Sequence, residues 1–172
     1  AYLSIGNDLI AGNQAGADSN RVVVDNARLE VTDFLYVGND SSYNEMVVSN
    51  GASVNVGANT RFGLPPNDDV SSSEGNSLLI TGAGTTYTHT NGALEIGYYI
   101  SDNNSVRVED GAHLYTKRIG NMTIRLGRDE NASGNSMTVT GSGTTWTNIA
   151  GPVFVGGSAA DGMLAIEDQA WA

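Results

Sequence analysis

The chain contains no cysteine, so it can form neither disulfide bridges nor thiolate metal sites. It has only 3 prolines against 22 glycines, a turn-rich composition of small residues without proline-rich linkers. Aromatic residues make up just 7% of the sequence. No apolar run approaches the length of a membrane-spanning helix, so we expect no membrane insertion of this segment.

Basic residues are also scarce. Eight Lys and Arg stand against 19 Asp and Glu, which gives a net charge of −11. Such a chain is repelled by nucleic acids and by anionic membrane surfaces. The nearest approach to a basic block is Lys117-Arg118 with Arg125 and Arg128, and the acidic Asp129-Glu130 follow it directly. We therefore expect no nucleic-acid partner.

The main feature of the sequence is a long internal repeat. Asn135–Gly156 reads NSMTVTGSGTTWTNIAGPVFVG, and Asn76–Gly97 reads NSLLITGAGTTYTHTNGALEIG. The copies share the Asn-Ser start, the Thr-Gly-x-Gly-Thr-Thr turn, an aromatic residue followed by Thr, and the closing apolar residue plus Gly. Repeats on this scale are typical of solenoids.

Each recurring unit has three parts. The first is a short strand with two apolar positions at a spacing of two, which places both on one face. A tight corner of Gly, Asn or Asp follows, and these residues tolerate positive φ. A second short strand comes next, and a third ends in an apolar residue plus Gly. The inward pairs of the first strand are Val22/Val24, Met46/Val48, Leu78/Ile80, Val106/Val108, Met137/Val139 and Leu164/Ile166. The third-strand ends are Leu3–Gly6, Leu35–Gly38, Phe62–Gly63, Leu94–Gly97, Ile124–Gly127 and Val153–Gly156.

The short strands, which come in threes, favour a parallel β-helix over a β-hairpin meander, because a meander would place Asn-Gly turns between long alternating strands. We predict an all-β solenoid over residues 1–172, with about three short strands in each of about six stacked coils. The variable spacing between units predicts insertions confined to one loop. The chain begins at Ala1–Gly6 and stops at Trp171-Ala172, both within the recurring pattern, so we expect a segment of a longer array, partial at both ends.

The same residues resemble a known repeat. The pattern V-T-G-x-G-T-T-W-T-N, then x-V-G and x-I-x-D/N-G-A, is similar to the repeat associated with autotransporter (type V secretion) passengers and PEP-CTERM-bearing exported proteins. The residues that carry it are Val139–Asn148, Val153–Gly156 and Leu164–Ala170, then Ile80–His89, Leu94–Gly97 and Val106–Ala112, and more weakly Val48–Ala52 and Val22–Ala27. The resemblance implies a right-handed parallel β-helix, secreted or held on the surface of a Gram-negative bacterium. It implies no catalytic residues. The insert Gly63–Gly75 and the Tyr87 in place of Trp depart from the pattern.

Tyr87 and Trp146 occupy matched positions, and two readings are available for them. Exposed in a row, they would form a platform for stacking sugars. Alternatively they fill a widened corner of the coil, which the free energy of burying an aromatic side chain favours. The flanking threonines, Thr85, Thr86 and Thr88 with their counterparts Thr144, Thr145 and Thr147, occur in alternate units only. They therefore fit ladders between stacked strands better than an ice-binding array.

The acidic loops Asn39-Asp40, Asn67-Asp68-Asp69 and Asp129-Glu130 offer the oxygen ligands that calcium prefers. The Gly-Gly-x-Gly-x-Asp nonapeptide of calcium-binding β-rolls is absent. Solvated turns are the favoured interpretation, with loop calcium as the alternative. No metal site and no cofactor is predicted.

Carboxylates and bases gather once, at Arg107, Glu109, Asp110, His113, Tyr115 and Lys117. Arg107 and Glu109 both point outward and can form a surface ion pair worth about 0–1 kcal/mol. A pair of carboxylates at catalytic spacing is not evident, and no serine nucleophile context is present. We predict no enzyme. A polysaccharide-processing β-helix enzyme, with a lyase or glycosidase-like activity at Glu109 or Asp110, is the alternative.

Val23, Val47 and Leu79 lie at outward positions and form an apolar column, a candidate assembly surface unless the loop Gly63–Gly75 covers it. The favoured hypothesis is a non-catalytic structural and adhesive module of an exported bacterial surface protein or extracellular fibre. Its expected partners are copies of itself, neighbouring repeats, or cell-surface glycans and proteins. A passive spacer without any ligand is a third possibility.

Overall fold

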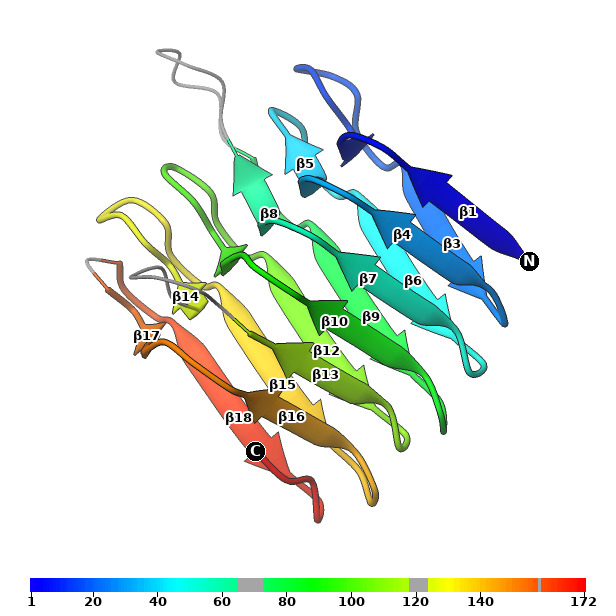
Figure 1. Cartoon of the computed structure of the whole chain (residues 1–172). Helices are drawn as coiled ribbons and strands as arrows, with labels where there is room; N and C mark the ends of the chain where they lie inside the picture. Colours follow the sequence, from blue (N-terminus) through cyan, green and yellow to red (C-terminus); the bar gives the residue numbers. More distant parts are fainter. Residues whose placement is uncertain (65–72, 118–123, 158) are drawn as a thin grey trace.

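The computed structural model describes residues 1–64, 73–117, 124–157 and 159–172. Within them the chain is all-β and forms three parallel sheets of six strands each (Figure 1). The fold is the predicted parallel β-solenoid with three strands in each coil. From β1 to β16, which hold equivalent places in one sheet, the chain makes five complete turns.

Each sheet collects one strand from every coil. Sheet A contains β1 (Tyr2–Ile5), β4 (Arg28–Val31), β7 (Ser53–Val56), β10 (Thr86–His89), β13 (His113–Thr116) and β16 (Thr145–Asn148). Sheet B contains β2 (Leu9–Ala11), β5 (Leu35–Asn39), β8 (Thr60–Leu64), β11 (Leu94–Ile96), β14 (Ile124–Leu126) and β17 (Val153–Val155). Sheet C contains β3 (Arg21–Asp25), β6 (Glu45–Ser49), β9 (Ser77–Thr81), β12 (Ser105–Glu109), β15 (Ser136–Thr140) and β18 (Met163–Glu167).

The apolar core runs along the inside of the three sheets. The inward pairs predicted for sheet C lie in register, so that Val24, Val48, Ile80, Val108 and Val139 form one buried row. Only Ile166, in the last strand, is 45% exposed. Stacking like residues in successive coils removes apolar surface from water continuously along the axis.

One predicted strand has a different place. The sequence pattern predicts that Leu3–Gly6 ends a third strand, but β1 pairs with β4, so that Leu3 lies beside Leu29 and Ile5 beside Val31 in sheet A. The strand that opens sheet B is β2, which pairs with β5 through Leu9 and Leu35. The pattern of an apolar residue plus Gly misleads here because Gly6 begins a short turn between sheets, whereas Ala11 and Gly12 hold the place expected for the third strand.

The corners between sheets C and A are the tight turns that the sequence predicts, and Asn50, Gly51, Asp110 and Gly111 have positive φ. Most of the variation in loop length lies between sheets B and C. It is not confined there, however, because residues 117–123 join β13 to β14, whereas residues 57–59 suffice between β7 and β8. The prediction of insertions in a single loop is therefore wrong.

A row of asparagines, buried from Asn44 onward and exposed only at Asn20, lies where the chain passes from sheet B to sheet C. Asn20, Asn44, Asn76, Asn104 and Asn135 each directly precede a strand of sheet C. In every step along the row, the backbone N–H and the side-chain Nδ2 of one asparagine both donate to Oδ1 of the next, at 2.9–3.0 Å. We call this row the asparagine ladder. It satisfies buried polar groups that a loop would otherwise leave unpaired.

The asparagine ladder also explains the glycine at the end of four of the six strands of sheet B, namely Gly12, Gly38, Gly63 and Gly97. A Cβ on Gly97 would lie 2.1 Å from Nδ2 of Asn135, and one on Gly38 would lie 2.3 Å from the amide of Asn76. Both glycines also have positive φ. The Gly at the end of one repeat thus packs against the Asn at the start of the next, as Gly97 does against Asn135.

Candidate functional site

The outer face of sheet B carries the densest group of charged and aromatic side chains. One residue from each strand faces outward there, and strand register places Tyr36 beside Arg61, Arg61 beside Glu95, Glu95 beside Arg125, and Arg125 beside Phe154. Neighbouring strands lie about 4.8 Å apart, so these side chains touch their neighbours in the row. We call this row the sheet B face.

Glu95 is the buried centre of the sheet B face, with only 2% of its surface exposed. Its Oε2 accepts a hydrogen bond from Nε of Arg61 at 2.7 Å, and its Oε1 lies 3.6 Å from Nη1 of Arg125. Removing a carboxylate from water costs free energy, so a buried carboxylate needs opposite charges close by to compensate it. Glu95 therefore fixes two guanidinium groups in place on the surface of the solenoid.

Aromatic rings from the loops at either edge pack on these arginines. The Arg61 guanidinium lies 5.5 Å from the ring centre of Phe34 and 5.0 Å from that of Tyr98. Arg128, just after β14, lies 4.4 Å from the ring centre of Tyr98 and 5.8 Å from that of Tyr99. Such cation–π contacts stabilise the arginines by about 0.5–2 kcal/mol each. Burial raises the pKa of the Tyr98 phenol above its ordinary value.

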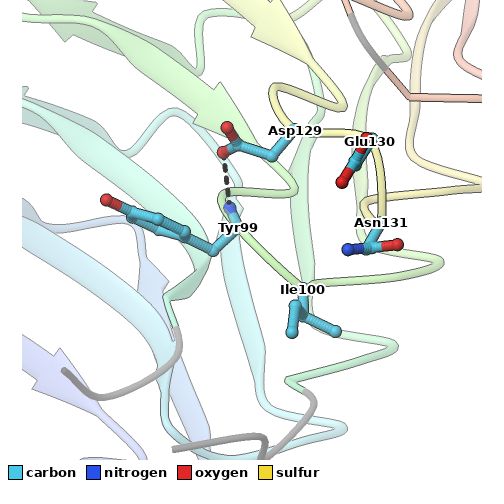
Figure 2. A pocket seen from close by; sticks show the side chains of 5 residues that line it. All are labelled: Tyr99, Ile100, Asp129, Glu130 and Asn131. Carbon is cyan, nitrogen blue, oxygen red and sulfur yellow. Dashed lines mark hydrogen bonds between the residues drawn. The ribbon is translucent and has the colours of Figure 1, made fainter. Parts of the chain in front are cut away.

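Two surface clefts open beside these rings. Tyr99, Ile100, Asp129, Glu130 and Asn131 line the first, of about 400 Å³. Figure 2 shows the backbone of Tyr99 next to Asp129 and its ring pointing away from Glu130 and Asn131. The backbone N–H of Tyr99 donates to Oδ2 of Asp129 at 3.1 Å, which ties the loops of two successive coils together (Figure 2). Arg125, Gly127, Arg128, Asp129, Phe154 and Gly157 line the second cleft, of about 380 Å³. Asp129 is common to both.

The predicted repeat aromatics lie inside the solenoid, in strands of sheet A rather than at a corner. Tyr87 is fully buried and Trp146 is 5% exposed. The Trp146 indole N–H donates to Oγ1 of Thr116 at 3.1 Å, and the Tyr87 hydroxyl lies 2.7 Å from Oγ1 of Thr60. Neither ring is available for stacking on a sugar.

Sequence reasoning missed that His89 also lies inside the solenoid. His89 is fully buried two residues after Tyr87, and its Nε2 lies 2.5 Å from Oγ1 of Thr60. Its Nδ1 is buried without a hydrogen-bond partner. Burial lowers the pKa of His89 to about 4, so the ring is neutral at pH 7. The alternation of inward residues along β10 was the available signal.

The candidate assembly column lies in register on the outer face of sheet C, where Val23 pairs with Val47 and Val47 with Leu79. Val23 is 48% exposed, whereas Val47 is buried, with 7% exposed, and Leu79 is half-buried. The column then continues into Arg107. Whether the insert covers it lies outside the described residues, because that loop includes residues 65–72.

The candidate catalytic group divides between two sheets. Arg107 and Glu109 form the expected ion pair on the outer face of β12, in sheet C. His113 and Tyr115 lie on β13, in sheet A, where Nδ1 of His113 is 2.7 Å from Oγ1 of Thr145. Asp110, at the corner, accepts a hydrogen bond from Oγ1 of Thr81 at 3.1 Å. The six residues thus do not line one cleft.

Two of the acidic loops bind backbone N–H groups. Asp40 accepts from the N–H of Ala15 at 3.2 Å, as Asp129 does from that of Tyr99. The third, Asn67-Asp68-Asp69, lies outside the described residues. In the part of the chain that the structure describes, no three His, Cys, Asp or Glu residues gather as metal ligands. No helix in these ranges is long and apolar enough to cross a membrane.

Comparison of the chain with models of known protein families, with curated proteins and with solved structures found no match. The resemblance to autotransporter-associated and PEP-CTERM-associated repeats therefore stays a prediction from the repeat motif. What the residues themselves define is a β-solenoid with a buried core and one outer face rich in arginine and aromatic groups.

Proposed function

We propose that this chain is a non-catalytic structural and adhesive segment of an exported bacterial surface protein or extracellular fibre. Outside the cell or on its surface, it acts as a stiff shaft that presents contact surfaces on its side. The observation that carries the proposal is the in-register pairing of every sheet from one coil to the next. Each coil then adds a nearest-neighbour interface, which gives a rod that resists bending.

The contrast between recurring inward residues and variable loops supports an adhesive role. The inward rows and the asparagine ladder recur from coil to coil and maintain the rod. The loops between sheets B and C differ in length and sequence, and they hold Tyr99 and Arg128 beside the sheet B face. Variable loops on a rigid scaffold are where binding residues usually lie.

Self-association is the second contact that we propose. The outermost described coils present apolar side chains, Leu3 at 57% exposed and Trp171 at 73% exposed. A neighbouring coil, from the parent chain or from a second copy, would cover them. The column of Val23, Val47 and Leu79 is the proposed surface for lateral contact.

Electron microscopy of the purified chain tests the shaft. Straight rods or filaments, with a strand spacing of about 4.8 Å along the axis by fibre diffraction, are expected. Val23→Lys is the variant for lateral contact and should separate paired filaments into single ones. Globular particles without an axis would overturn the shaft proposal.

Adhesion is tested separately, with fluorescent beads that carry the protein. Beads should attach to bacterial or animal cells more strongly than beads that carry an inert protein of equal charge. No attachment to any cell type, with rods intact, would show a passive spacer instead. Release of reducing or unsaturated sugar ends from polysaccharides, lost in Glu109→Gln or Asp110→Asn, would replace the proposal with the enzymatic alternative.

A further inference from the structure

Two clefts flank the Asp129 segment, one on the side of Tyr99 and the other on the side of Phe154. Their volumes, about 400 and 380 Å³, fall in the range of roughly 300–1,000 Å³ that is usual for small-ligand sites. Because both clefts are lined by Asp129, one extended ligand can occupy the two together.

The aromatic rings at this surface are exposed, in contrast to those of the core. Tyr99 is 50% exposed and Phe154 is 46% exposed, whereas Tyr87 is fully buried. Tyr98 stands edge-on to Tyr99, with 4.5 Å between ring centres and 83° between ring planes. That contact and Arg128 hold the Tyr99 ring in a defined orientation. A flat, rigid, exposed ring is suited to pack against the C–H face of a pyranose.

Charges of both signs lie next to one another around the clefts. Nε of Arg128 lies 3.8 Å from Oδ2 of Asp129, and Glu95 lies between Arg61 and Arg125. Arginine supplies only donors and a carboxylate only acceptors, while a sugar hydroxyl is both. Neighbouring donors and acceptors that are already fixed can therefore bind adjacent hydroxyl groups by charge-assisted hydrogen bonds.

We infer that these two clefts bind an uncharged polysaccharide, whose sugar rings stack on Tyr99 and Phe154 while their hydroxyls bond to Arg128 and Asp129. The inference rests on the proposed adhesive function and names the chemical class of its ligand. The net charge of −11 repels polyanions at long range, so an acidic polysaccharide is disfavoured. The fixed arginines disfavour a cationic polymer at close range.

The probes are hexasaccharides of β-1,4-linked glucose, xylose, mannose and N-acetylglucosamine, with hexagalacturonate and a sulfated glycosaminoglycan as charged counterparts. Binding is measured by titration calorimetry on the whole chain. At least one uncharged hexasaccharide should bind, and more tightly than either charged one. Raising the salt from about 50 to about 500 mM should change its affinity less than about twofold, because no net charge is neutralised.

Tyr99→Ala, Phe154→Ala and Arg128→Gln should each weaken that binding about tenfold or more. Tyr43→Ala is the matched control for Tyr99. Tyr43 is also an exposed loop tyrosine, at 58%, and its φ of 57° is close to the 55° of Tyr99. The two substitutions thus carry the same backbone strain, but only the first removes a ring from the clefts. Unchanged melting temperatures check that the fold is retained.

Absence of binding to every uncharged hexasaccharide would overturn the inference, as would tighter binding of a charged one. Binding that is equally strong in the Tyr99, Phe154 and Arg128 variants would place the ligand elsewhere and overturn it too. These results leave the shaft and bead experiments unaffected. If beads still attach to cells while none of these glycans binds, the adhesive function stands and its ligand belongs to another class.

Discussion

Asn104 donates two hydrogen bonds to Oδ1 of Asn135 in the next coil, one from its backbone N–H and one from Nδ2, each 3.0 Å long. The same pair of bonds links Asn76 to Asn104. The asparagine ladder is therefore a continuous buried chain of polar contacts parallel to the axis. It makes the stability of each coil depend on a side chain in the next.

Asn104→Ala should destabilise the fold strongly, because it removes the acceptor of the buried backbone N–H of Asn76, one acceptor of the Asn76 Nδ2, and the Nδ2 that donates to Asn135. Leaving buried donors unpaired costs about 1–3 kcal/mol each, so we expect a loss of about 2–5 kcal/mol in the free energy of unfolding. Urea denaturation followed by circular dichroism measures it.

Asn55→Ala is the control for that substitution, because Asn55 lies on the outer face of β7 and is half-buried. It should change the free energy of unfolding by less than about 0.5 kcal/mol. Equal losses for Asn55→Ala and Asn104→Ala would show that the ladder has no special part in stability.

Gly97→Ala should be poorly tolerated for two reasons that can be separated. Its φ of +76° costs an alanine about 1–2 kcal/mol, and overpacking against Asn135 adds about 1–3 kcal/mol. Gly51→Ala has the same φ of +77° but no atom within 4 Å of the added Cβ, so only the first cost applies. Thermal unfolding of both variants should show the larger loss for Gly97→Ala. An equal loss would mean that Asn135 moves aside freely.

The architecture could be predicted because one rule governs most of it. Inward apolar residues at a spacing of two, such as Val106 and Val108, recur with positive-φ corners, such as Asp110-Gly111, and this combination defines stacked parallel strands. The rule failed at the first strand, where Leu3–Gly6 fits the motif of sheet B but pairs in sheet A. A local motif cannot tell two sheets apart, because the sheet is decided by which strand it pairs with.

The candidate site was beyond such reasoning, because its residues are far apart in sequence. Arg61 meets Tyr98, and Tyr99 meets Asp129, only after loops of unequal length have set the stacking of the coils. Asn76 and Asn135 were visible as the start of the repeat, but their mutual packing depends on strand register. In the sequence, Glu95 looks like an ordinary outward-facing acid, and only the structure shows the two arginines beside it.

Glu95→Gln should destabilise the chain by about 2–4 kcal/mol. The substitution removes the negative charge between Arg61 and Arg125, and breaking a buried ion pair leaves charges uncompensated. Glu109→Gln breaks the exposed pair with Arg107 and should cost less than about 1 kcal/mol. The two unfolding free energies, measured by urea titration at neutral pH, check the difference. A loss for Glu95→Gln no larger than that for Glu109→Gln would mean that solvent already compensates both arginines.

Stability should fall in mild acid because of His89. Burial lowers its pKa from the ordinary 6.5 to about 4, so between these two values the unfolded chain binds a proton that the folded chain does not. Stability is therefore unaffected by His89 above pH 6.5 and is lost as the pH falls, by about 3 kcal/mol in total at pH 4. No hydrogen bond at Nδ1 offsets the burial of the charged ring.

His89→Val tests this, because Val56 holds the equivalent place in the preceding coil. Urea denaturation at pH 7.5, 6, 5 and 4.5 should show a shallower decline for the variant than for the original chain, even if the variant is less stable at pH 7.5. The carboxylates titrate alike in both proteins, so the difference in slope belongs to His89 alone. Parallel curves would contradict the burial of a neutral histidine, and would mean that the coil opens enough at acid pH to hydrate the ring.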